Sequence, residues 1–148
     1  MALDWEIAYA LRLFYREIAM IWKIVVVAAI GAVGMLPAAA FADAASEIAT
    51  ATDHAGYAVA GTNLAAVRMH LHHAINCLVG PQGKEFDSHN DNPCANAGNG
   101  AIPDTTNGAT KAKLDSVVVR AEAGISTNDQ TTAKKDASDV YALLRAIK

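Results

Sequence analysis

An uninterrupted apolar run near the N-terminus is the strongest constraint in this sequence. Residues 24–42 (IVVVAAIGAVGMLPAAAFA) contain no charged side chain, and Lys23 precedes them. A basic residue, an apolar stretch, the helix-breaking Pro37 and a final small-x-small triplet, Ala40-Phe41-Ala42, are typical of a secretory signal peptide. The run therefore predicts export, with residues 43–148 forming a helical domain in the periplasm.

Two interpretations of residues 1–42 stay open. In the first, the signal peptide is cleaved, and Met20 is the true start because 22 residues precede Lys23. In the second, residues 3–20 form an amphipathic helix on the cytoplasmic surface and residues 24–42 remain as an inner-membrane anchor. As a helix these 19 residues are about 28 Å long, just enough to span a bilayer. An uncleaved anchor predicts a single-span accessory subunit of a larger membrane complex, with its bundle on the periplasmic side.

The rest of the chain shows helical periodicity. Aromatic residues make up only 6% of the sequence and alanine is abundant, which favours closely packed helices over a sandwich or barrel. Gly61 and Gly80-Pro81 are expected to end the first two helices, although these two helices could also be continuous. Gly124 is expected to end the third helix, and Thr127 to begin the fourth with a capping box. The predicted helices cover residues 44–60, 63–79 and 110–123, with the last one beginning at 127.

This pattern predicts an all-α, up-and-down four-helix bundle, preceded by the apolar N-terminal helix. A long segment rich in Gly, Asn, Asp and Pro, residues 80–108, connects helices two and three. Cys77 ends helix two and Cys94 lies in this loop. Two cysteines in an exported domain usually pair, and closing a loop of this size contributes about 3 kcal/mol. The alternative is a reactive thiol, because His73 lies four residues before Cys77.

Three histidines within four residues are the most informative polar feature. On a helix, His70 and His73 share a face with Cys77, so the disulfide would pull the loop over both imidazoles. His89 in the loop is then a third candidate ligand, beside Asp87 and Asp91. Such a set suits zinc or copper; haem is less favoured, because the chain has no Cys-x-x-Cys-His sequence.

A structural role for the same histidines stays open. His70 and His73 can instead hydrogen-bond backbone groups of the covering loop and hold it in place. A further histidine, His54 on helix one, is expected to face the start of helix two rather than this cluster.

Charge and residue content narrow the classes of function. The net charge of −3 and pI near 5.9 exclude a nucleic-acid binder, which needs a basic face. The sequence shows no convincing carboxylate pair or Ser-His-Asp set, so we expect a non-enzymatic protein. Its alanine-rich helices suit packing against partners, either a membrane protein complex or further copies of the chain.

Two strings carry a resemblance. HLHHAINCLVGPQG (residues 70–83) and NPC…GNGAIPD (residues 92–104) resemble a family of small, uncharacterised exported bacterial proteins. The resemblance covers about 35 residues and implies no activity. It implies that His70, His73, Cys77, Cys94 and the glycine-rich loop belong to one unit. The export signal and helical plan are also similar to periplasmic cytochrome and copper-storage bundles, although the chain lacks a haem attachment motif and a ladder of cysteines.

Overall fold

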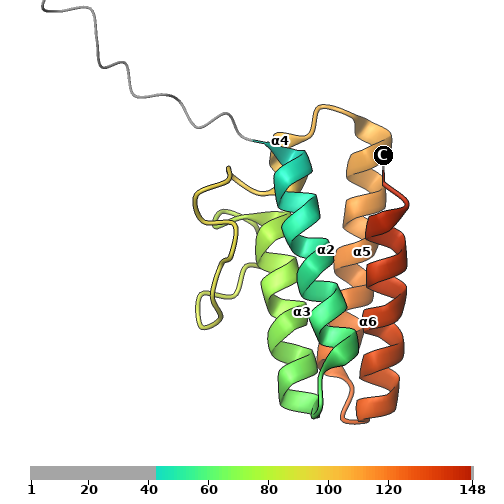
Figure 1. The fold of residues 1–148 in the computed structure, drawn as a ribbon. Coiled ribbons are helices and arrows are strands. Elements are labelled where there is room, and N and C mark those ends of the chain that lie inside the picture. The colour runs from blue at the N-terminus through green and yellow to red at the C-terminus, as the bar shows by residue number, and fades with distance from the viewer. Residues whose placement is uncertain (1–42, 148) are drawn as a thin grey trace, which may run out of the picture. The chain divides into compact units, whose positions relative to one another are not determined.

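The structure, a computed structural model, describes residues 43–147. Its helices are α2 (Ala44–Ala60), α3 (Leu64–Val79), α4 (Ala101–Asp104), α5 (Gly108–Ser126) and α6 (Gln130–Arg145). The four long helices run alternately up and down, side by side (Figure 1). The predicted all-α four-helix bundle is therefore confirmed. The apolar run and the helix predicted for it lie outside the described residues.

None of the helices within residues 43–147 combines the length and the apolar character needed to cross a bilayer.

The four long helices enclose one core. α2 packs against α3 and α6, and α5 packs against the same two helices, so the four form a closed ring. Apolar residues at spacings of three and four point into its centre, as expected for amphipathic helices. Many of these positions are alanine, which lets the helix axes approach closely. The largest fully buried apolar side chains are Leu71, Leu78, Leu114 and Leu144, with Val67, Val117 and Val140 beside them.

Short turns with capping side chains set the helix ends. α2 stops at Gly61, and the Asn63 side chain accepts a hydrogen bond of 2.8 Å from the Ala66 amide, so α2 and α3 are separate helices. The predicted capping box at Thr127 is wrong. Asp129 is the N-cap of α6 and its carboxylate accepts from the Thr132 amide at 2.7 Å.

The prediction that Gly124 ends the third helix is also wrong. α5 continues to Ser126, and Gly124 is buried inside it. A Cβ atom at this position would lie 2.8 Å from Leu71 Cδ1 and 3.1 Å from Asp136 Cβ. Gly124 therefore serves the close approach of α5 to its neighbours rather than a helix end.

The long connection between α3 and α5 is tied back to the bundle. The predicted disulfide joins Cys77 of α3 to Cys94, with the two Cα atoms 5.1 Å apart. Gly80 and Gly100 cross with φ of 67° and 113°, and a Cβ on Gly80 would lie only 1.5 Å from the Asn99 carbonyl oxygen. Only glycine fits this crossing. The short helix α4, which the sequence analysis did not predict, follows the crossing.

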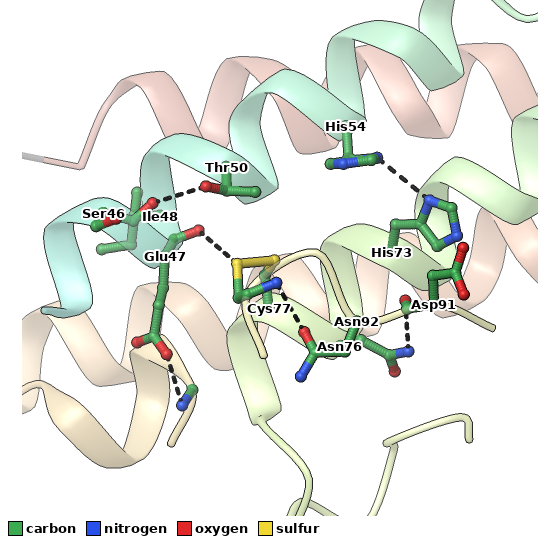
Figure 2. The surroundings of a disulfide bond; sticks show 12 residues. Ser46, Glu47, Ile48, Thr50, His54, His73, Asn76, Cys77, Asp91 and Asn92 are labelled. Atoms are coloured by element: carbon green, nitrogen blue, oxygen red, sulfur yellow. Dashed lines mark hydrogen bonds between the residues drawn. A yellow bond between two sulfur atoms is a disulfide. The ribbon is translucent and has the colours of Figure 1, made fainter. Parts of the chain in front are cut away.

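A buried carboxyl group anchors the far end of the loop. Glu47 of α2 is fully buried, and the Gly100 amide donates to its Oε1 at 2.8 Å. Its Oε2 has no hydrogen-bond partner among the described residues. Burial raises the pKa of Glu47, which the Gly100 hydrogen bond partly opposes and the charges of Asp104 and Asp43 reinforce. The Cys94 sulfur lies 3.9 Å from the Glu47 carbonyl oxygen, a packing contact since a disulfide sulfur carries no hydrogen (Figure 2).

Candidate metal centre

The α2–α3 hairpin brings three histidines together. His54 lies six residues before Ala60, the last residue of α2, and His70 lies six residues after Leu64, the first of α3. Because a short turn joins two antiparallel helices, residues equally far from the turn lie opposite one another. His73 lies one turn beyond His70 on the same face. The hairpin register therefore places one imidazole from α2 against two from α3.

The three rings converge through their nitrogen atoms. His54 Nδ1 lies 3.3 Å from His70 Nδ1 and 3.3 Å from His73 Nδ1. All three ligand nitrogens lie within 4.8 Å of one another. His73 is buried, with 8% of its surface exposed, whereas His54 and His70 are partly buried and open to solvent on one side. Figure 2 shows His54 on α2 facing His73 on α3, one turn from the disulfide.

Hydrogen bonding alone does not satisfy this arrangement. A ring nitrogen carries either one hydrogen or one lone pair in the plane of the ring. His54 Nδ1 can therefore form one well-directed hydrogen bond, yet it faces two other Nδ1 atoms at the same distance. A cation placed between the rings would accept all three lone pairs at once. Two nitrogens bound to a tetrahedral zinc ion at about 2.0–2.1 Å are roughly 3.3–3.4 Å apart, which matches these separations.

The imidazoles are held in the neutral form that binds metals. Burial lowers the pKa of His54, and the nearby His73 and His70 lower it further, against the opposing charge of Asp53. Burial also lowers the pKa of His70. For His73, burial is again the main cause, followed by His70, with Asp91 opposing. Since the ordinary pKa of histidine is about 6.5, all three rings are mainly neutral at pH 7.

One aromatic side chain flanks the cluster. Tyr57 lies one turn after His54 on α2, and its ring centroid is 5.5 Å from those of both His54 and His70. Tyr57 is 55% exposed, so it borders the open side of the site without closing it. The cluster therefore combines one buried imidazole, His73, with two that solvent partly reaches, His54 and His70.

The loop contacts α3 beside the cluster, through Asn76. This fully buried side chain donates from Nδ2 to the carbonyl oxygens of Asp87, Asn90 and Asp91, and its Oδ1 accepts from the Asp87 amide at 2.9 Å. The role of Asn76 as the residue that anchors the loop was not predicted. The signal for it was its position, because Asn76 is a polar residue on the face of α3 that is otherwise mostly apolar and buried.

The structure brings together two of the three predicted ligands. His70 and His73 belong to the cluster, whereas His89 does not: its side chain is 94% exposed and its Nδ1 lies 3.3 Å from Asp87 Oδ1. The Asp87 carboxyl group also lies 3.3 Å from His72 Nδ1, so His89 and Asp87 are on the His72 side of α3, away from the cluster. His54 takes the third place. The expectation that His54 faces the start of α3 is wrong, because the hairpin register sets it opposite His70.

Comparisons of the chain with protein families, with curated proteins and with solved structures find no match.

Proposed function

We propose that this chain is an exported, non-enzymatic helical protein that binds one transition metal ion through His54, His70 and His73. The convergence of three Nδ1 atoms, two pairs of which are 3.3 Å apart, carries the proposal. Zinc is the ion whose tetrahedral geometry and imidazole preference fit these separations best. Square-planar Cu²⁺ needs adjacent nitrogens only about 2.8 Å apart at bond lengths of roughly 2.0 Å, so we expect it to fit less well.

The accessibility of the site favours reversible binding. Three protein ligands leave one tetrahedral position to water or to an incoming ligand, the pattern of open zinc sites. The partial exposure of His54 and His70, beside the exposed Tyr57, suits access of an ion from solvent. We therefore propose a protein that takes up and releases its ion, with binding rather than catalysis as its role.

Export rests on two features. The Cys77–Cys94 disulfide suits an oxidising compartment, and the apolar run at residues 24–42 ends in a small-x-small triplet. Cleavage after Ala42 would leave Asp43 as the first residue of the mature protein. Intact mass of the protein from a periplasmic fraction tests this, and a mature chain that retains residues 24–42 would support a membrane-anchored subunit instead.

Metal analysis tests the binding proposal. Tag-free protein is stripped with a chelator, dialysed, loaded with Zn²⁺ and examined by native mass spectrometry. We expect one ion per chain. At a free zinc concentration 100 times the Kd, binding stabilises the fold by about 2.7 kcal/mol, which raises the Tm by roughly 10–20 °C in a domain of this size. A metal-free spectrum together with an unchanged Tm would refute zinc binding.

A further inference from the structure

The loop that covers α3 presents a carboxyl group to the proposed metal site. Two links hold the backbone of Asp91 in place. Its carbonyl oxygen accepts from Asn76 Nδ2 at 3.1 Å, and three residues later Cys94 is bonded to Cys77. Asn76 itself lies one turn after His73 on α3. The segment around Asp91 is therefore held against the same helix that supplies two of the three imidazoles.

The carboxyl group of Asp91 lies on the loop side of the cluster, close enough to influence His73 by its charge. In Figure 2 it lies on the side of the His73 ring away from His54, and within the described part of the chain no hydrogen bond or ion pair joins the two side chains. The electrostatic effect of Asp91 on His73 agrees with this position, since it raises the pKa of that ring against the effect of burial. The neighbouring Asp87 points elsewhere, toward His72 and His89.

A divalent ion at this site would be stabilised by a nearby negative charge. Three neutral imidazoles bring no negative charge to a divalent cation, so the ion would keep its full charge in a partly buried site. Asp53 also acts on the site, through His54, but it is an exposed side chain on a regular helix. Asp91 is also exposed, but it differs because tertiary contacts and a disulfide hold its backbone against α3, the helix that carries the most buried of the three ligands.

We propose that Asp91 is an electrostatic partner of the metal site, whose carboxylate offsets the charge of the bound ion from the loop side of His73. This inference rests on the proposed metal binding. A carboxylate several ångströms from a divalent ion changes metal affinity by about tenfold through its charge alone. The disulfide would then serve the site as well as the fold, because it keeps Asp91 in place.

Zinc titration of three variants, with a chromophoric chelator as competitor, tests the proposal. We expect Asp91→Asn to weaken zinc binding by about tenfold, while Asp91→Glu keeps most of the affinity. Asp87→Asn is the matched control, with the same change of charge in the same loop, and should stay within about twofold of the wild type. The zinc-free Tm of Asp91→Asn should equal that of the wild type, and its zinc affinity should depend less on ionic strength.

The outcomes separate the two proposals. If the wild type binds zinc and Asp91→Asn binds it equally well, the role of Asp91 is refuted and the metal site stands. If Asp87→Asn and Asp91→Asn weaken binding to the same extent, the effect belongs to loop structure and the specific role of Asp91 is again refuted. If the wild type binds no zinc, the proposed function itself fails.

Discussion

The two helical hairpins of this bundle have the same architecture and different facing residues. In α5–α6 the polar contact is an ion pair, with Arg120 Nη1 3.2 Å from Asp136 Oδ1. In α2–α3 the polar contact is the group of three imidazoles, with a disulfide-held loop beside it. Opposite charges satisfy each other within α5–α6, whereas hydrogen bonds among three imidazole nitrogens cannot satisfy all of them. We therefore propose that α5–α6 mainly supports the fold and that α2–α3 holds the metal site.

Removing the disulfide should affect the α2–α3 side most strongly. We expect the Cys77→Ser/Cys94→Ser double variant to lose about 3 kcal/mol of unfolding free energy, because the closed loop spans 17 positions. Urea unfolding of both proteins measures the difference. A loss below about 1 kcal/mol would mean that the hydrogen bonds of Asn76 hold the loop without the covalent link.

Acid should weaken the fold through the histidine cluster. The folded chain holds the pKa of His54, His70 and His73 below the ordinary value of about 6.5 that applies to the unfolded chain. Below pH 6.5 the unfolded chain therefore binds protons that the folded chain excludes. The stabilisation is complete above that pH and is lost as the pH falls through the lowered values.

Unfolding between pH 7.5 and 5, with a chelator present, measures this dependence. The difference between the wild type and His54→Gln isolates the cluster from Glu47, whose raised pKa acts in the opposite direction. We expect the His54→Gln variant to show a flatter profile. Identical profiles would show that the imidazoles titrate alike in the folded and unfolded chains.

The ion pair of the other hairpin should matter least. Arg120 is 46% exposed, whereas Asp136 is buried, so the pair is only half exposed. Arg120→Ala leaves a buried carboxylate without this partner, so we expect it to cost about 1–2 kcal/mol of unfolding free energy and to leave zinc affinity unchanged. A larger loss of stability, or any loss of zinc affinity, would contradict the division between the two hairpins.

The sequence was sufficient for the fold and for part of the site. Apolar spacing and the Gly61 and Gly80 breaks predicted α2 and α3 closely, because amphipathic periodicity and glycine both act locally. The helix ends predicted at Thr127 and Gly124 were wrong. Asp129 caps α6 instead, and Gly124 is a glycine because of its close packing on Leu71. Helix α4 is only four residues long and has no periodic signal.

The third histidine depended on tertiary register. His70 and His73 share a helix face, which spacing alone reveals. His54 joins them because the tight turn between α2 and α3 sets residues at equal distances from the turn opposite each other. Once the turn is placed at residues 61–63, counting six residues from each helix end pairs His54 with His70. His89 instead lies in the loop with its backbone amide and Nδ1 close to Asp87 Oδ1, a local contact that no periodicity encodes.

Zinc titration of two single variants tests the central claim most directly. The variants are His54→Gln, which removes an imidazole of the cluster, and His89→Gln, which removes the exposed imidazole that the sequence favoured. The account predicts that His54→Gln loses more affinity than the roughly 10- to 100-fold cost of an outer partner, while His89→Gln binds like the wild type. Wild-type affinity in His54→Gln, or a comparable loss in His89→Gln, would contradict a metal site between α2 and α3.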